Sequence, residues 1–371
     1  MTIRVLDLFA GAGGLTAGLH SATAGFSTVA AVEMDIAAAA TFDATFGEGI
    51  VEARPIEEWL VDGNVPTSVD VVVGGPPCQG FSTLGKRDVE DVRNSLWRRY
   101  AETILRTGPK YFVIENVEAF QRSIEFQKLT DETSTGVLRD YDFVHGVLNA
   151  ADYGAPQARR RAIVIGRHRD LPNPGLPLPT HAREEMLGLD RHKTVGEAFA
   201  GIPVEPDMDA VFGSRFHDFG GKRFDGAFSP RELHWSRDYR QLSLDRFRAI
   251  PAGGNRFDLP WELQAPCWRK HQSGSADVMG RLRRDRPSVT IRTEFFKPEK
   301  GRYIHPTADR AITHYEAAVL QGFPSTHRFV GSRTAIARQI GNAVPIALGA
   351  AIGRHLAAAL AKAEEPESRA A

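Results

Sequence analysis

Cys78 has the surroundings expected of a nucleophile. It lies in GGPPCQGFS, directly after an apolar run that is typical of a buried strand. The glycines and prolines before it predict a stiff turn with close access to the backbone. A thiolate at such a turn could attack an electrophilic carbon. The alternative is a small buried side chain, the commonest role of a free cysteine. Cys267, in APCWRKH, has no neighbouring strand end or partner acid.

A carboxyl group and an arginine run accompany two other apolar runs. Glu115 begins ENV directly after YFVI, where a carboxyl group in a cleft can donate a hydrogen bond to a ring nitrogen. The alternative is a helix cap formed by Asn116. In QARRR, Arg159 and Arg161 would point the same way on an extended segment. With Gln157 they could donate to a base or hold the carboxylate, although three consecutive arginines are usually a solvated surface.

Two further motifs are typical of nucleotide binding. In DLFAGAGGL a predicted strand runs into a turn and a helix, and Gly11, Gly13 and Gly14 allow a ligand close to backbone N–H groups. The pattern is GxGG, shorter than the dinucleotide fingerprint, so a tight structural turn is a nearly equal alternative. Glu33 follows Gly13 at the spacing of an acid that accepts hydrogen bonds from a ribose. The alternative interpretation of this motif is that Asp35 stabilises the N-terminus of a helix, and both can hold.

These motifs need a sheet that brings the ends of its strands together. The first 170 residues alternate apolar runs with helical stretches, which predicts an α/β fold with a doubly wound parallel sheet. Ligands bind at the carboxyl ends of such strands. The predicted strands are 3–9, 28–32, 69–74, 111–114, 142–148 and 162–165, and the predicted helices include 15–24, 36–46 and 95–107.

The sequence changes character near residue 170. LPNPGLPLPTH is typical of a linker, and from there to about residue 290 the chain is irregular and rich in Arg, Gly and aromatic residues. We interpret this region as a second, smaller domain. A single long helix is predicted over 334–361, and the tail after residue 364 is expected to fray.

Charge is unevenly distributed along the 371 residues. The formal net charge is zero, with −9 in residues 1–150, +6 in 151–300 and +3 in 301–371. An acidic first part joined to a basic second part is expected when only part of the chain faces a polyanion. Chance segregation of solvated surfaces is an equal alternative.

Composition argues against several other classes of protein. The chain is 42% hydrophobic and 25% charged, as in soluble globular proteins. We expect no apolar run that could span a bilayer, and MTIRVLDLFAGAGG lacks the layout of a secretory signal, which predicts a cytoplasmic protein. With two cysteines and no Cys/His cluster of zinc-ligand spacing, neither a disulfide framework nor a metal site is expected.

Taken together, the motifs resemble the cytosine-C5 DNA methyltransferase family of the bacterial modification type. DLFAGAGGL, VEMD, GGPPCQGFS, ENV, QARRR, RPSVTIR, HYEAAVLQGFP and RQIGNAVP occur in the family's order over nearly the whole chain. The resemblance implies a Rossmann-like methyltransferase sheet with a smaller, irregular target-recognition domain. The implied domains are 1–175 for catalysis and S-adenosylmethionine binding, 176–324 for target recognition, and 325–371 as a segment that returns to the catalytic domain.

The resemblance also implies roles for individual residues. Cys78 is the nucleophile, Glu115 pairs with the base at its N3 and amino edge, and Arg159 and Arg161 contact the flipped cytosine or brace the site. The residues implied to contact DNA are Gln79, Ser82 and Gln157. Those implied to bind S-adenosylmethionine are Phe9, Gly11, Gly13, Gly14, Leu15, Glu33 at the ribose hydroxyls, Met34 near the adenine, Ile56, Pro76, Asn342 and Val344.

One stretch departs from the family pattern. VEARPIEEW stands where the family often has an acid in a Gly-Asp-Ile-like segment, which binds the adenine amino group. Ile56 can supply the apolar contact, but Pro55 occupies the position expected for the acid. Glu52 or a backbone group could substitute for it.

The implied chemistry explains why these residue types are needed. Adding a thiolate at C6 of cytosine breaks the ring's aromaticity and makes C5 enamine-like. A proton or hydrogen bond at N3 stabilises the displaced electrons. A stacked base cannot reach such a pocket, so it must leave the duplex. Residues 80–98 are expected to close over it as a mobile lid, and the basic middle region to contact phosphates and base edges.

The expected partner is double-stranded DNA, with S-adenosylhomocysteine as the product of the donor. A monomer is expected, and a cognate restriction endonuclease could be encoded nearby. Three alternatives stay open at this point: the same chemistry on tRNA, a catalytically silent DNA-binding regulator, and an NAD-dependent dehydrogenase. The dehydrogenase leaves PPC and ENV unexplained, and the irregular region favours duplex DNA through Trp235, Trp261 and Trp268.

Overall fold

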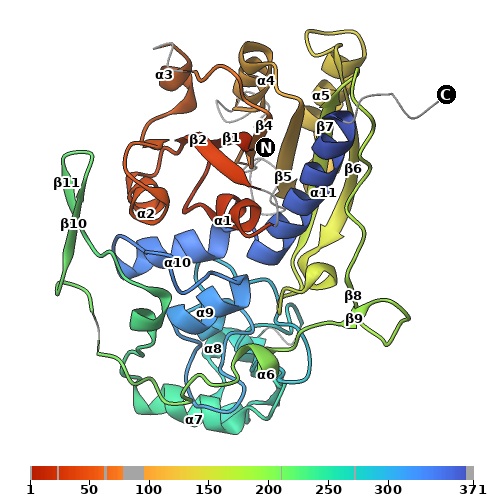
Figure 1. Ribbon diagram of the computed structural model, residues 1–371. Coiled ribbons are helices and arrows are strands. Elements are labelled where there is room, and N and C mark those ends of the chain that lie inside the picture. Colours follow the sequence, from red (N-terminus) through yellow and green to blue (C-terminus); the bar gives the residue numbers. More distant parts are fainter. Residues whose placement is uncertain are drawn as a thin grey trace.

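A seven-stranded sheet forms the centre of the computed structural model (Figure 1). The model describes residues 2–22, 25–61, 65–77, 96–209, 211–270 and 273–364. The strand order is β3-β2-β1-β4-β5-β7-β6. The strands are β1 (Ile3–Leu8), β2 (Phe26–Val32), β3 (Val51–Glu52), β4 (Val71–Gly74), β5 (Tyr111–Val117), β6 (Tyr141–Asn149) and β7 (Arg160–His168).

The expected Rossmann-like α/β fold is confirmed, with two corrections. First, β7 runs antiparallel to both β5 and β6, whereas the other pairs are parallel. The short connection between β6 and β7 contains one 3₁₀ turn and no crossover helix, so the chain reverses there. Second, β3 was missed, because a two-residue edge strand that pairs only with β2 leaves no alternating pattern in the sequence.

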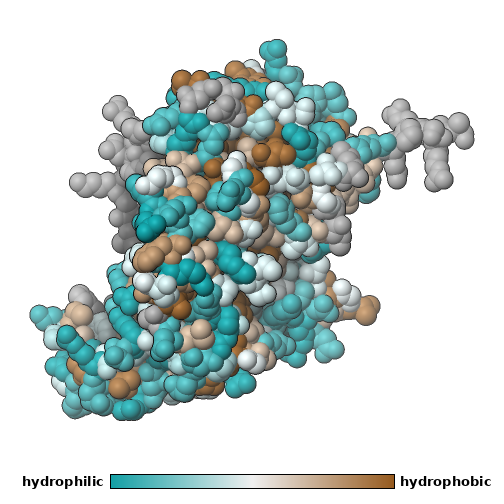
Figure 2. Space-filling view, turned by 60° about the vertical axis from the view of Figure 1, so that its left-hand side comes forward, coloured by the Kyte–Doolittle hydropathy of each residue, from teal (hydrophilic) through white to brown (hydrophobic). Residues whose placement is uncertain are grey.

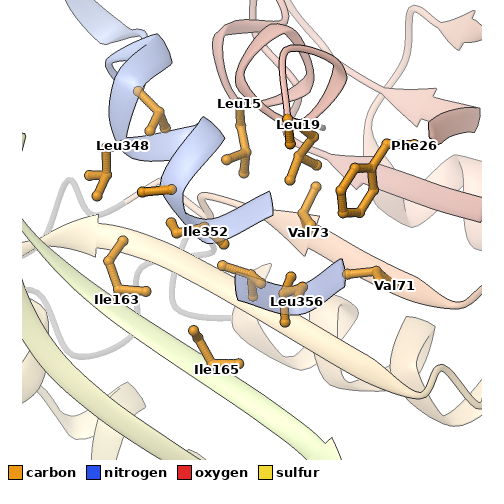
Figure 3. Close-up of a cluster of buried hydrophobic side chains, with 14 of the residues drawn as sticks. Leu15, Leu19, Phe26, Val71, Val73, Ile163, Ile165, Leu348, Ile352 and Leu356 are labelled. Carbon is orange, nitrogen blue, oxygen red and sulfur yellow. The ribbon is translucent and has the colours of Figure 1, made fainter. Parts of the chain in front are cut away.

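Helices cover both faces of the sheet. Because side chains alternate along a strand, Val71 and Val73 face one side and Val72 the other. The first side is buried by α1 (Gly14–His20) and the C-terminal helix α11 (Ile346–Glu364). Figure 3 shows Leu348, Ile352 and Leu356 of α11 above the sheet. The helices α3 (Ile56–Val61), α4 (Leu96–Thr107) and α5 (Ile124–Ser134) bury the second side, and α2 (Ile36–Phe46) follows β2.

The expected single helix over 334–361 is two helices. The chain forms α10 (Arg333–Asn342), leaves helical geometry at Ala343, and resumes as α11 after Pro345. Proline disfavours a helical residue before it, which explains the break. By length and composition alone α11 could span a membrane, contrary to the expectation that no apolar run would qualify. Its leucine and isoleucine side chains are buried against α1 and the sheet, as in the core helix of a globular protein.

The region from about residue 176 has short elements joined by long loops. In Figure 2 its surface is mainly hydrophilic, with small apolar patches. A hydrophobic core joins it to α1 and α10 through Ala17, Ile336 and Ile340. The proposed domain boundaries stay a prediction. The elements are β8 (His181–Ala182), β9 (Asp190–Arg191), α6 (Val195–Ala198), β10 (Phe216–Phe219), β11 (Lys222–Asp225), α7 (Gln241–Ala249), α8 (Pro266–Lys270) and α9 (His314–Gln321).

Candidate functional site

The segment after β4 is fastened to the end of β5. The side-chain amide of Asn116 donates a hydrogen bond to the carbonyl oxygen of Pro76 at 3.0 Å. A Cβ on Gly75 would lie 3.0 Å from the Glu115 Oε2 atom, so a glycine allows this close approach. Asn116 does not cap the following 3₁₀ turn, whose N-cap is Val117 without a side-chain bond. The alternative reading of Asn116 as a helix cap is therefore wrong, and its amide instead holds the segment that leads to Cys78.

Glu115 forms an ion pair with Arg161. The Nε atom of Arg161 lies 2.8 Å from Glu115 Oε1, and the two side chains are only 14% and 12% exposed. The pair follows from the antiparallel register, because Arg161 stands opposite Val117 and so is a diagonal neighbour of Glu115 on one face. The guanidinium therefore fixes the direction in which the carboxyl group points.

Arg159 is bonded to the backbone of two distant segments. It is buried and donates to the carbonyl oxygens of Ile291 at 2.9 Å and Gly341 at 3.0 Å. Burial is the largest of the causes that lower the pKa of Arg159 to about 9; the charge of Arg161 acts in the same direction, and that of Glu115 opposes it. Arg159 is buried and the Arg161 side chain is 14% exposed, whereas that of Arg160 between them is 62% exposed, as expected if Arg159 and Arg161 point to the same side. Arg159 joins the start of β7 to two distant segments.

Gln157 is fully buried and bonded within the protein. Its Nε2 donates to the side chain of Gln321 at 2.8 Å, and its Oε1 accepts from the N–H of Ile291 at 2.9 Å. The expected contact with DNA does not fit this arrangement, since both ends of the amide are already used inside the protein. The expected residues Cys78, Gln79 and Ser82 lie outside the described residues, as does most of the expected lid, 80–95.

Glu33 joins the ends of β1 and β2. Its Oε2 accepts from the N–H of Gly11 at 2.8 Å, and its Oε1 from the N–H of Asp35 at 2.7 Å. Burial raises the pKa of Glu33, and these backbone hydrogen bonds oppose the rise. Phe9 and Gly11 both adopt positive φ, at 58° and 56°. The backbone of the glycine-rich loop thus turns sharply around the Glu33 carboxylate.

The closing segment lies beside the same loop. A Cβ on Gly14 would lie 3.0 Å from the carbonyl oxygen of Val344, and one on Gly13 only 2.2 Å from the ring of Phe46, so both positions need glycine. Asn342, at the end of α10, is exposed. The side chain of Leu15 is buried in the core beneath (Figure 3), so only its backbone can face a ligand.

Met34 and Ile56 differ in their access to solvent. Met34, two residues after β2, is 67% exposed, whereas Ile56, the first residue of α3, is buried in the core. The carboxylate of Glu52, the suggested substitute for the missing acid, accepts from Trp59 Nε1 at 3.0 Å and pairs with Arg54. Glu52 is thus already engaged within the protein.

Sequence reasoning missed Asp7, at the start of the glycine-rich motif. Asp7 is buried and accepts a hydrogen bond from Thr16 Oγ1 at 2.6 Å, which ties β1 to α1. Burial, with a smaller contribution from Glu33, raises the pKa of Asp7 to about 7, against the lowering effect of Thr16. The signal that could have revealed Asp7 was an acidic residue inside a predicted apolar strand. Arg338, which pairs with Asp35 at 3.3 Å, had no such signal because it lies about 300 residues away in sequence.

The comparisons with known proteins agree over nearly the whole chain. The family model of the C-5 cytosine-specific DNA methylases matches residues 3–358. The type II methyltransferase M.XorII of Xanthomonas oryzae pv. oryzae is 36% identical, over 98% of this chain and 86% of its own length. The type II methyltransferase M1.HphI of Haemophilus parahaemolyticus is 32% identical, over 95% of this chain and 86% of its own length.

Two solved structures share the fold. A protein from an E. coli prophage, described as a DNA modification methyltransferase, matches with a TM-score of 0.71 and 24% identity, over 97% of this chain and 99% of its own. The S. pombe Dnmt2 methyltransferase matches with a TM-score of 0.54 and 15% identity, over 98% of this chain and 100% of its own. At these identities the two structures bear on the fold alone. From the family match and the curated relatives, this chain belongs to the C-5 cytosine-specific DNA methylase family and is a DNA cytosine-5-methyltransferase of the bacterial type II modification type.

Proposed function

We propose that the protein methylates carbon 5 of a cytosine within a specific duplex DNA site, using S-adenosylmethionine and a transient bond from Cys78 to C6. The observation that carries this proposal is the ion pair between Glu115 and Arg161, which lies beside the segment leading to Cys78. The glycine-rich loop and Glu33 stand at the same edge of the sheet. Nucleophile, acid and donor site would therefore meet at one place.

Each residue would have a distinct part in the reaction. The Cys78 thiolate adds to C6, and the displaced ring electrons move toward N3. The carboxyl group of Glu115 stabilises them there by a proton or hydrogen bond, in the orientation that Arg161 fixes. Bound S-adenosylmethionine supplies the electrophilic methyl group for the activated C5. Loss of the C5 proton to a base then expels Cys78 and restores the aromatic ring.

The described residues fit this methyl donor. The exposed thioether of Met34 offers an apolar surface to an adenine ring. The N–H groups of Gly11 and Asp35 bond to different oxygens of the Glu33 carboxylate, and a carboxylate with about four lone-pair sites can also accept hydrogen bonds from a ribose. Among the described residues, apart from the neighbours of Gly11 in the chain, no atom lies within 4 Å of the place where a Cβ on Gly11 would stand, so a ligand can approach the loop there. Asn342 is exposed beside the loop to receive the rest of the donor.

The relatives suggest the biological setting. Because M.XorII and M1.HphI are named type II methyltransferases, we propose that this protein acts in a restriction-modification system, as a monomer, on DNA in the bacterial cytoplasm. Comparing methyl incorporation into duplex DNA and into tRNA tests the substrate. Greater incorporation into tRNA would contradict the DNA assignment.

Trapping the covalent adduct tests the mechanism. Duplex DNA with 5-fluorocytosine at the target position, incubated with S-adenosylmethionine, should yield a protein–DNA complex that survives denaturation, because fluorine cannot leave as a proton does. Bisulfite sequencing of DNA from cells that express the protein first locates the target. Cys78→Ser should abolish both the adduct and methyl transfer. Cys267→Ser is the matched control, since Cys267 is exposed and should be dispensable. An adduct that persists in Cys78→Ser would refute the assignment.

A further inference from the structure

The hairpin of β10 and β11 projects from the irregular region and lies beside α2 (Figure 1). Its strands pair antiparallel, with Phe219 opposite Lys222. The two residues of its turn, Gly220 and Gly221, both adopt positive φ, at 56° and 71°. A two-residue turn of this kind, with both φ values positive, matches the twist of its strands and fixes their register. The tip of the hairpin is therefore a defined structure.

The two faces of β10 have different surroundings. Phe216 is 54% exposed, its ring lies under the Arg223 guanidinium at 5.8 Å, and Arg223 also pairs with Asp218 at 2.9 Å. On the opposite face, Phe219 is half-buried. It packs against the small cluster of Ala10, Ala31, Ala39, Phe42 and Val51. The inner face of the hairpin thus docks on the sheet region, while the outer face stays in solvent.

The docking place adjoins Glu33. Ala10, a member of that cluster, belongs to the glycine-rich loop that bonds to Glu33. A Cβ on Gly220 would lie 3.2 Å from Ile36 Cδ1, at the start of α2 and one residue after Asp35. Because Asp35 also donates a backbone hydrogen bond to Glu33, the tip lies against the start of α2 next to one donor to this carboxylate, and Phe219 packs on the cluster that includes Ala10 of the loop holding the other.

The root of the hairpin is fastened to the closing segment. The N–H of Gly331 donates to the carbonyl oxygen of Asp225 at 2.7 Å. Gly331 lies just before α10, whose Arg338 pairs with Asp35. Root and tip therefore connect to the same part of the sheet edge by two separate routes.

We infer that the β10–β11 hairpin is a positioning element of the methyl-donor site. Phe219 and the turn hold the glycine-rich loop and the start of α2 in the arrangement in which Glu33 and Met34 receive the adenosine of the donor. This inference rests on the proposed function, which takes Glu33 and Met34 as donor-binding residues. Phe219 acts through the small apolar cluster on which it packs, and is not itself a donor-binding residue.

Phe219→Ala and Phe216→Ala in the full chain test the inference. The two positions lie in the same strand with opposite surroundings, so Phe216→Ala is a matched control. Binding of S-adenosylhomocysteine without DNA, measured by titration calorimetry, should weaken about fivefold or more in Phe219→Ala and less than about twofold in the control, because small displacements in a preorganised site weaken binding strongly. The KM for S-adenosylmethionine should rise in Phe219→Ala, with kcat at saturating donor within about twofold of wild type.

Other outcomes decide against the inference. Equal affinities of Phe219→Ala and Phe216→Ala for S-adenosylhomocysteine would overturn it and leave the proposed function intact. Failure of the wild-type protein to bind S-adenosylhomocysteine would overturn the proposed function itself. If thermal melting shows that Phe219→Ala is unfolded, Phe219→Leu replaces it. Leucine retains most of the apolar volume of phenylalanine, so the affinity of Phe219→Leu should lie between those of the wild type and of a hairpin-deleted variant in which a Gly-Ser link replaces 216–225. Equal affinity of the hairpin-deleted variant and the wild type would refute the role.

Discussion

The sheet region and the irregular region both have apolar cores but differ in what accompanies them. In the sheet region, two apolar clusters fill the space between strands and helices on either face. In the irregular region, apolar clusters are joined by buried arginines that bond to loop carbonyls. Arg281 donates to the carbonyl oxygens of Phe247, Ile250, His305 and Ala308. Loops without regular hydrogen bonding leave such carbonyls unpaired, and a guanidinium with five donors can satisfy several at once.

The buried arginines change how the net positive charge of residues 151–300 is interpreted. We expected the positive middle of the chain to contact phosphates. Yet Arg159, Arg256 and Arg281 are buried, and Arg302, just beyond residue 300, donates to the carbonyls of Gly253 and Gly254. These cations stabilise the loops and are not available to DNA. Net charge counted along a sequence therefore overstates the charge on a binding surface.

The largest expected effect comes from removing an internal arginine. Arg281→Met should lower the free energy of unfolding by at least about 3 kcal/mol, because each buried carbonyl left unpaired costs about 1 to 3 kcal/mol. Urea denaturation measures the change. Arg283→Met is the control, since Arg283 is exposed. Similar stabilities of the two variants would contradict the idea that internal arginines hold the irregular region.

Leu348→Ala tests the sheet region in the same way. Leu348 is fully buried in α11 above the sheet (Figure 3), so the cavity left by its truncation should cost about 3 kcal/mol. Ala357→Gly in the same helix serves as a control for helix propensity, at about 1 kcal/mol. If the loss for Leu348→Ala did not exceed that of the control, apolar packing would not be what secures α11.

A smaller effect is expected where α1 and α11 cross. A Cβ on Gly18 would lie 2.7 Å from the Cα of Gly349, so Gly18→Ala must separate the helices. Overpacking of this kind costs about 1 to 3 kcal/mol, and we expect a value near 2. Thermal melting detects the loss. An unchanged or raised melting temperature would show that the crossing adjusts without cost.

The smallest effect concerns the pH dependence of stability. The pKa of Asp7 is about 7 in the folded protein against 3.8 ordinarily, so the folded state binds more protons between these values. The contribution of Asp7 to stability is thus full below about pH 4 and is lost as the pH rises to about 7. Buried His314 and His327, whose pKa values burial lowers to about 4 and about 3, act in the opposite direction. Because these histidines also change the pH dependence of stability, the wild type must be compared with a variant that lacks only the carboxyl group of Asp7.

Asp7→Asn is that variant. Unfolding free energies at pH 6 and pH 7 should show that the wild type loses about 1 kcal/mol more than Asp7→Asn over this interval. Parallel profiles for the two proteins would rule out a proton on Asp7 as a source of stability.

The sequence allowed prediction where a repeating pattern reflects a repeating structure. Apolar runs placed β4 and β5, and with them Glu115, because strand position alone decides which end of the sheet a residue occupies. The partners of Arg159 could not be predicted, since they are carbonyls at 291 and 341 that no periodicity links to it. The hydrogen bonds of Arg281 could not be predicted for the same reason. Pro345, in contrast, was a visible signal that the predicted single helix should be divided in two.

The place of α11 in the core affects how the chain can be made. The strands of the sheet are complete by residue 168, but α11, which with α1 covers one face, begins only at Ile346. At ribosomal rates of about 5 to 20 residues per second, that face waits on the order of ten seconds or more for its cover. Nascent chains that stop before α11 therefore expose a broad apolar surface and should depend on chaperones, and a separately supplied α10–α11 peptide should rescue their solubility.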